Sequence, residues 1–199
     1  MDLDNLIISK TEDTALIHAL TQAAFAEYGR ELGTSTALKE TEEAIAAQFA
    51  GGMQALVVYL SPTSPPTPSP GRSYLTGKGE PDSGSLLSQR RMSARERRVG
   101  EERLPLASVR YQIEGDALYF HRLSVHPDYR RQGRAKKLIG HLEALARAQG
   151  LARLTCSVRL QKTDNIALYT GLGFQLLGER SVCRDGTPVA TGDFEKRLG

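Results

Sequence analysis

Few cysteines and no long apolar run are present in this chain of 199 residues, and both absences exclude classes of protein. Cys156 and Cys183 are too few for a disulfide framework, and no Cys/His spacing resembles a metal site. No stretch approaches the roughly 18 apolar residues that span a bilayer, and the acidic N-terminus is not typical of a signal peptide. We therefore expect a soluble, cytoplasmic protein that needs no metal and binds no membrane.

The net charge is also small and unevenly placed. A formal charge of +3 does not by itself indicate a nucleic-acid-binding protein. Residues 61–103 hold eight Lys/Arg, five Asp/Glu and six of the nine prolines, a composition that cannot bury enough apolar surface to fold. We expect a disordered or exposed insertion here. The alternatives are an arm that touches acidic partners or RNA, and a lid over an active site.

Hydrophobic periodicity outside 61–103 predicts one α/β domain over residues 1–199. A helix capped by Thr11 is expected to carry apolar residues through Phe25. Further helices are expected at 40–50, 134–149 and 165–172. Strands are expected at 6–9, 55–60, 104–114, 117–125, 154–158, 174–177 and 190–197.

A basic loop with one glycine connects an apolar strand to an amphipathic helix at residues 118–149. Its cations would repel one another and the positive end of the helix dipole unless an anion lay among them. The first amides of a helix are unpaired, so a loop that turns at Gly133 can surround a phosphate with N–H donors. The loop matches neither the Walker A spacing nor the G-x-G-x-x-G fingerprint, which argues against both common nucleotide sites.

Two segments, LSVHPDYRRQGRAKKLI and NIALYTGLGF, together resemble the GNAT N-acetyltransferase superfamily. Arg130, Gly133 and Ala135 occupy the fixed positions of its [Q/R]-x-x-G-x-[G/A] motif. The second segment matches through Asn165, Leu168, Tyr169, Gly173 and Phe174, with Ala167 one place off. The resemblance implies a mixed, mostly antiparallel sheet that is splayed near the basic loop and flanked by helices on both faces.

The resemblance also implies an activity, the transfer of an acetyl group from acetyl-CoA to a primary amine by direct attack within a ternary complex. The acceptor would be a small-molecule or protein amine, with no metal involved. An alternative is a non-catalytic acyl-CoA-binding or regulatory module. We do not expect a nucleic-acid partner, and a homodimer is left open.

The residues expected to bind CoA follow position by position from the resemblance. The amides of Gln132, Gly133, Arg134 and Ala135 would bind the pyrophosphate, with the Arg130 side chain nearby. The backbone of Leu123, Ser124 and Val125 would pair with pantetheine as an added strand. Asn165 would contact the pantetheine arm, while Arg131, Lys136 or Lys137 would hold the 3′-phosphate or simply be solvated.

Tyr169 is the expected general acid, because a neutral phenol can donate a proton to the departing CoA thiolate. The candidates for the base that accepts the amine proton are His121, Glu27 and a chain of waters. Side chains alternate along a strand, so only one of His121 and Arg122 is expected to face the cleft. The same alternation places His121 on one face with Leu123 and Val125.

Overall fold

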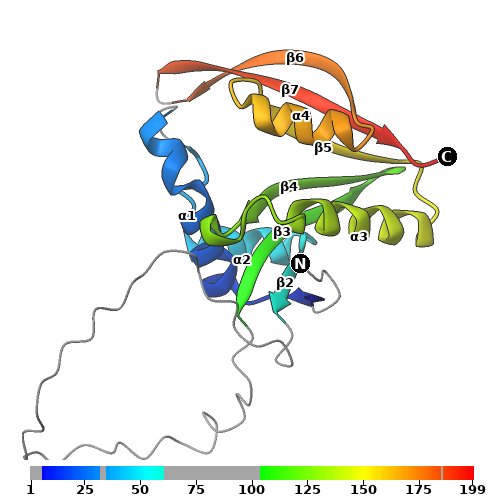
Figure 1. The fold of residues 1–199 in the computed structure, drawn as a ribbon, viewed down its shortest axis with the longest axis horizontal. Coiled ribbons are helices and arrows are strands. Elements are labelled where there is room, and N and C mark those ends of the chain that lie inside the picture. Colours follow the sequence, from blue (N-terminus) through cyan, green and yellow to red (C-terminus); the bar gives the residue numbers. More distant parts are fainter. Residues whose placement is uncertain (1–5, 32–34, 61–103, 185) are drawn as a thin grey trace, which may run out of the picture.

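The computed structural model describes residues 6–31, 35–60, 104–184 and 186–199. Four α-helices are found in these ranges: α1 (Thr14–Glu31), α2 (Glu42–Ala50), α3 (Arg134–Ala148) and α4 (Thr163–Gly171). The strands are β1 (Leu6–Thr11), β2 (Gln54–Leu60), β3 (Pro105–Glu114), β4 (Ala117–Val125), β5 (Arg153–Arg159), β6 (Gln175–Arg184) and β7 (Thr187–Arg197). A short 3-10 turn (Pro127–Tyr129) lies between β4 and α3 (Figure 1).

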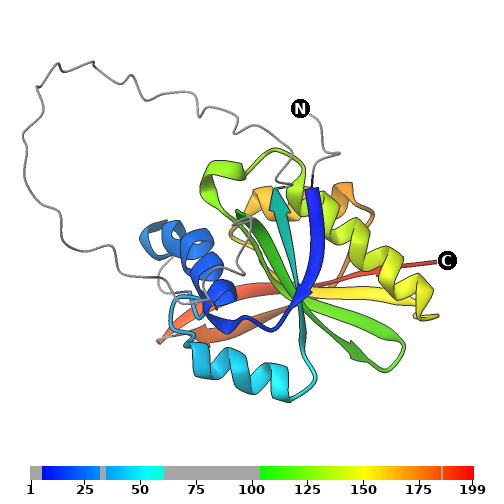
Figure 2. The same cartoon turned by 90° about the horizontal axis from the view of Figure 1, so that it is seen from below.

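The seven strands form one sheet in the order β1-β2-β3-β4-β5-β7-β6, and every neighbouring pair except β4–β5 is antiparallel. Alternate residues of β2 point to opposite faces of the sheet. Leu56 and Val58 join the core beneath α3 and α4, whereas Ala55 and Val57 pack with Ile17 of α1 and with α2. Figure 2 shows α3 on one side of the sheet and α1 and α2 on the other. Helices therefore cover both faces.

The sheet opens between its two parallel strands. β4 and β5 are paired only through Ala117, Leu118 and Tyr119 of β4, although both strands continue further. Beyond Tyr119, β5 stays paired with β7 and β4 stays paired with β3. Figure 1 shows the two halves diverging from this junction, with α1 at the open end. The predicted splay is confirmed, and it leaves one edge of β4 free of a strand partner.

A β-bulge lies in this open part of β4. Ser108 pairs with Ser124 and Arg110 with His121, so one residue of β3 faces two residues of β4. Arg122 adopts a left-handed backbone with φ of 51°, as an extra residue in a bulged strand can require. The bulge reverses the alternation of side chains beyond this point.

The predicted α/β class and the positions of the helices and strands are confirmed, with two differences. The cap of α1 was wrongly predicted. Asp13 accepts a hydrogen bond from the Leu16 amide at 2.9 Å, whereas Thr11 lies at the end of β1 and accepts one from the Asp13 amide. The last two strands are longer than predicted. The insertion expected at 61–103 lies outside the described residues.

Candidate active site

One cavity of about 890 Å³ fills the opening between β4 and β5. It extends from the N-terminus of α3, past the β4 bulge and α4, to α1 and β6. Most of the predicted site residues line it: Glu27, His121, Leu123, Val125, Arg130, Arg131, Gly133, Arg134, Ala135, Lys136, Asn165 and Tyr169. Ser124 and Gln132 do not line it. Ser124 is buried, and its hydroxyl donates to the Arg122 carbonyl at 3.0 Å, so it contributes to the bulge.

The basic loop enters α3 in the conformation that an anion cradle needs. Gly133 is the N-cap with φ of 78°, a left-handed conformation that a side chain would strain. The first hydrogen bond of the helix runs from the Lys137 amide to the Gly133 carbonyl. The amides of Arg134, Ala135 and Lys136 precede it and therefore point out of the helix end.

The arginine that follows Gly133 supports the same interpretation. Its guanidinium lies over the Tyr129 ring at 5.2 Å, and one terminal nitrogen donates to the Gln132 side chain. Burial lowers the pKa of Arg134, and its Nε is buried without a hydrogen-bond partner within the described part of the chain. A phosphate oxygen is a suitable acceptor for such a donor. The residues at this helix end therefore fit a pyrophosphate group.

Arg130 and Glu27 contact each other, although each was predicted to have its own role. A terminal nitrogen of Arg130 donates to the Glu27 carboxylate, and the other donates to the Ala24 carbonyl at 2.7 Å. The Arg130 side chain thus connects α1 to the loop that follows β4. Its contribution to CoA binding and the use of Glu27 as a base both stay predictions.

The bulge corrects the predicted orientation of β4. His121 and Arg122 both line the cavity, and His121 faces the α1/α2 side, whereas Leu123 and Val125 pack with the core beneath α3. The prediction that only one of the pair faces the cleft was wrong, because it assumed strict alternation. His121 Nε2 lies 2.8 Å from Met53 Sδ. Burial, helped by the nearby charges of Arg110 and Arg122, lowers the pKa of His121 to about 3.

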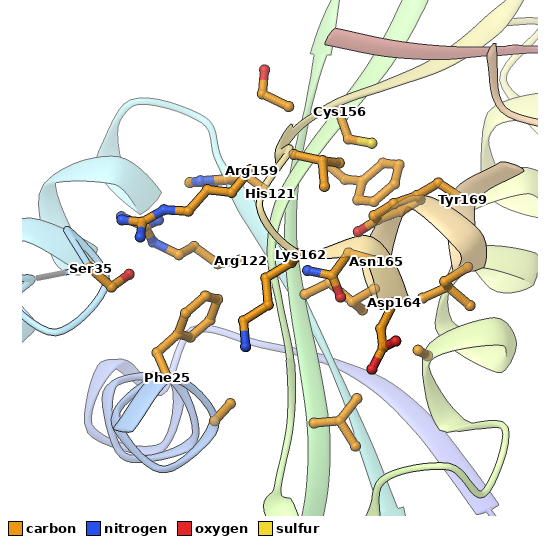
Figure 3. A pocket seen from close by; sticks show the side chains of 18 of the residues that line it. Phe25, Ser35, His121, Arg122, Cys156, Arg159, Lys162, Asp164, Asn165 and Tyr169 are labelled. Carbon is orange, nitrogen blue, oxygen red and sulfur yellow. The ribbon is translucent and has the colours of Figure 1, made fainter. Parts of the chain in front are cut away.

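Tyr169 belongs to an aromatic cluster, which we define as Phe120, Tyr169, Phe174 and Phe194. The Tyr169 ring centroid lies 5.6 to 6.2 Å from those of the three phenylalanines, and the side chain is only 7% exposed. Figure 3 shows the ring packed at one side of the cavity with its hydroxyl directed inward, beside Asn165 and below Cys156. The packing thus fixes the ring with its hydroxyl directed into the cavity.

On the other side of the cavity lies an ion network, which we define as Glu40, Gln48, Arg110 and Arg122. Glu40 accepts from Arg110 through both carboxylate oxygens, and Arg122 Nε lies 3.4 Å from Glu40 Oε2. Gln48 bonds to both Glu40 and Arg110. Burial alone would raise the pKa of Glu40, but the hydrogen bonds and charge of Arg110 overcome it and hold that pKa at about 2. Glu40 is therefore ionised at neutral pH.

Sequence reasoning missed the ion network and most of the far lining of the cavity. Phe25, Thr36, Arg159, Lys162 and Arg180 line it without having been predicted. Arg110 and Glu40 lie 70 positions apart, so no local motif could reveal their contact. Arg159 and Lys162, in contrast, lie within ten residues of Tyr169, at the end of β5 and just before α4. This position in the sequence could have predicted that they lie near the cavity.

Neither a metal centre nor a membrane span is found in the parts of the chain that the structure describes. No group of three or more His, Cys, Asp or Glu side chains could hold a metal ion there. None of the described helices is long and apolar enough to cross a membrane. Cys156 is buried and Cys183 exposed, both as free thiols.

Comparison with solved structures identifies the class of fold. The ribosomal-protein-S18-alanine N-acetyltransferase of Escherichia coli matches with a TM-score of 0.61 at 19% identity, covering 98% of this chain and 94% of that one. A Salmonella typhimurium protein assigned as an acetyltransferase, solved with acetyl-CoA, matches with a TM-score of 0.61 at 14% identity, covering 98% and 95%. The chain therefore has the fold of these acetyltransferases.

Sequence comparison then identifies the family. Residues 80–174 match the family model described as Acetyltransferase (GNAT) family. The [Ribosomal protein bS18]-alanine N-acetyltransferase of Escherichia coli strain K12 is 35% identical over 81 residues, which are 41% of this chain and 53% of that protein. The chain thus spans about half the length of the curated relatives it matches. The predicted resemblance to the GNAT acetyltransferase superfamily is thus confirmed over residues 80–174.

Proposed function

We propose that this protein transfers an acetyl group from acetyl-CoA to a primary amine by direct attack, without an acetylated enzyme intermediate. One observation carries the proposal. A single cavity joins the glycine loop at α3, the open edge of β4 and Tyr169. Such a cleft can hold both substrates together, and holding reactants in attack geometry is itself a large source of rate enhancement.

Three parts of the cleft would bind acetyl-CoA: the start of α3, the open edge of β4 and the region of the bulge. The amides at the start of α3 and Arg134 would hold the pyrophosphate, with Arg131 and Lys136 nearby for the 3′-phosphate. The unpaired edge of β4 would hydrogen-bond the pantetheine arm, with Asn165 on its other side. This places the thioester near the bulge, where backbone donors can stabilise the oxyanion that forms during attack.

Tyr169 is the proposed general acid. The amine nitrogen attacks the acetyl carbon, a tetrahedral intermediate forms, and the carbon–sulfur bond then breaks. As that bond breaks, the phenol donates its proton to the sulfur, so that CoA leaves as the thiol. The inward hydroxyl and the fixed ring support this role (Figure 3).

We propose that water in the cleft, rather than a side chain, takes the proton that the amine loses. A histidine with a pKa of about 3 is a weak base at neutral pH, which argues against His121. Glu27 is half exposed and paired with Arg130, which argues against an activated carboxylate. Because Glu27 is half exposed, solvent reaches this end of the cleft, and a water can serve instead.

The acceptor is an amine, and the name of the Escherichia coli relative makes a protein α-amine one candidate. Cytoplasmic location stays a prediction from the low cysteine content. The purified protein, incubated with acetyl-CoA and a panel of amines, should release CoA thiol and yield an amine heavier by one acetyl group. A Gly133→Trp variant should lose this turnover. Binding of acetyl-CoA without turnover of any amine would instead favour the regulatory module.

A further inference from the structure

The guanidinium of Arg134, at the start of α3, is held by the protein through one face and one terminal nitrogen. Its central carbon lies over the Tyr129 ring, 5.2 Å from the ring centroid. Nη1 donates to the Tyr129 carbonyl at 3.3 Å and to Gln132 Oε1 at 2.5 Å. These contacts fix the direction in which the remaining N–H groups of the guanidinium point.

The opposite edge of the same guanidinium, formed by Nε and Nη2, has no acceptor. Nε is buried, and neither nitrogen donates a hydrogen bond to any residue that the structure describes. The two nitrogens carry parallel N–H bonds, which match two oxygens of one phosphate or carboxylate. A buried donor without an acceptor costs free energy, so this edge indicates a ligand that supplies two oxygens.

The charge of Arg134 supports an anion as that ligand. Burial lowers its pKa, because the guanidinium has lost part of its hydration. The side chain nevertheless stays protonated at neutral pH, as arginine does throughout proteins. Within the described part of the chain, no carboxylate forms an ion pair with it. An anion at the Nε–Nη2 edge would compensate for the lost hydration.

Tyr129 can orient Arg134 because its own ring is fixed. The residue ends the short turn after β4, and its amide donates to the His126 carbonyl at 2.9 Å. The ring packs against the core beneath α3, and its centroid lies 5.7 Å from that of the His126 ring. Its hydroxyl forms no hydrogen bond with the described residues. The aromatic face, rather than the hydroxyl, therefore makes the contact with Arg134.

We propose that Tyr129 is a positioning residue, which together with Gln132 orients Arg134 so that Nε and Nη2 bind two oxygens of the CoA diphosphate. The inference rests on the proposed acetyl transfer and adds a residue that acts through Arg134 rather than on the substrate. Arginine stacks on aromatic faces and pairs with phosphate oxygens through its edge, so both contacts can exist together. A side chain that is already ordered loses less entropy when the donor binds.

Three acetyl donors test which group Arg134 binds. They are acetyl-CoA, acetyl-dephospho-CoA, which lacks the 3′-phosphate, and S-acetylpantetheine, which has no phosphate. In Arg134→Gln, kcat/KM for both nucleotide donors should fall at least about 10-fold relative to that for S-acetylpantetheine, because hydrogen bonds between charged groups are lost. A fall with acetyl-CoA but not with acetyl-dephospho-CoA would place Arg134 at the 3′-phosphate and overturn the proposal.

Variants of Tyr129 then test the positioning role, with the donor ratio defined as kcat/KM for acetyl-CoA divided by kcat/KM for S-acetylpantetheine. Tyr129→Leu should lower this ratio about 5-fold, through the KM for acetyl-CoA rather than kcat. Tyr129→Phe keeps the aromatic face and should restore the parent's ratio. The double variant Tyr129→Leu/Arg134→Gln should match Arg134→Gln alone, because Tyr129 acts only through Arg134.

Arg147→Gln is the control for the loss of a positive charge from the same helix. Arg147 lies in the last turn of α3, at the opposite end from Arg134, so the donor ratio should not change. A fall as large as that in Arg134→Gln would show that the ratio follows net charge rather than an oriented side chain, and it would overturn the proposal.

An unchanged donor ratio in Tyr129→Leu, equal losses in Tyr129→Leu and Tyr129→Phe, or additive losses in the double variant would overturn the positioning role. If Tyr129→Leu does not fold, Arg134→Lys decides. Lysine keeps the charge but not the stacked, paired donors, so the ratio should fall as in Arg134→Gln, and a parental ratio would overturn the proposal.

Failure of the proposed function has a different signature, because the parent would then acetylate no amine with any donor. In that event, calorimetric titration of CoA, dephospho-CoA and pantetheine into the same variants measures the same differences as affinities. Losses of CoA affinity in the order given above would support the role of Tyr129, and parental affinities in Tyr129→Leu and Arg134→Lys would overturn it.

Discussion

The two regions that flank the cleft, the aromatic cluster and the ion network, hold their key residues in opposite ways. Tyr169 is fixed by ring packing, which is not directional and does not use the hydroxyl. Arg122 is fixed by directional bonds to Glu40, which in turn binds the buried Arg110. A substitution at Tyr169 should therefore change the rate of turnover without changing the free energy of unfolding. A substitution in the ion network should change the free energy of unfolding.

Glu40→Gln should produce the largest change. Gln keeps the shape but removes the carboxylate that pairs with both Arg110 and Arg122. Breaking a buried ion pair costs about 3–5 kcal/mol in the free energy of unfolding. Urea denaturation at pH 7 measures it. Glu179→Gln, at an exposed position on β6, should stay within about 0.5 kcal/mol of the parent. Equal stability of the two variants would show that the ion network contributes nothing.

The same carboxyl predicts the direction of acid destabilisation. The folded pKa of Glu40, at about 2, is below the ordinary value of 4.5, so its stabilisation is fully present above pH 4.5. It is lost as the pH falls from 4.5 toward 2. The free energy of unfolding of the parent should therefore approach that of Glu40→Gln over this range. If the difference in the free energy of unfolding between the parent and Glu40→Gln stayed constant from pH 6 to pH 3, the assigned pKa would be contradicted.

Tyr169→Phe should separate chemistry from stability in the aromatic cluster. The ring and its contacts remain, so thermal unfolding should change little. Loss of the acid should lower kcat about 10²-fold or more, a typical magnitude for acid–base catalysis. Thiol release at saturating substrates measures it. An unchanged kcat with normal folding would remove Tyr169 from the mechanism.

Gly133→Ala should weaken acetyl-CoA binding without a comparable loss of kcat. A β-carbon in the left-handed conformation costs about 1–2 kcal/mol, so the loop relaxes and the cradle amides lose alignment. We expect the KM for acetyl-CoA to rise about 10-fold. Gly140→Ala, within α3 and with open space around the added carbon, should leave KM unchanged. Equal KM values for both variants would argue against the cradle.

The smallest predicted effect concerns pH. A His121 pKa of about 3 means that this ring is already neutral between pH 5 and 8. The dependence of kcat/KM on pH should therefore follow the acceptor amine, with no inflection near 6.5. An inflection there that disappears in His121→Gln would restore histidine as the base.

Sequence predicts the parts of this site that are local in the chain. The turn at Gly133 and the start of α3 are consecutive, so their geometry follows from residue type and order. The bulge at Arg122 depends on pairing with β3, and alternation alone gave the wrong face for His121. Glu40 meets Arg122 across 82 positions, a contact that only the folded sheet creates. The ion network was therefore beyond prediction, while the conformation of the glycine loop was not.

Direct transfer within one cleft is tested most directly by initial rates measured with the concentrations of both substrates varied. Direct attack predicts intersecting lines in double-reciprocal plots and no acetylated protein when acetyl-CoA is added alone. Parallel lines, together with a stable mass increase of one acetyl group on the protein, would contradict the account.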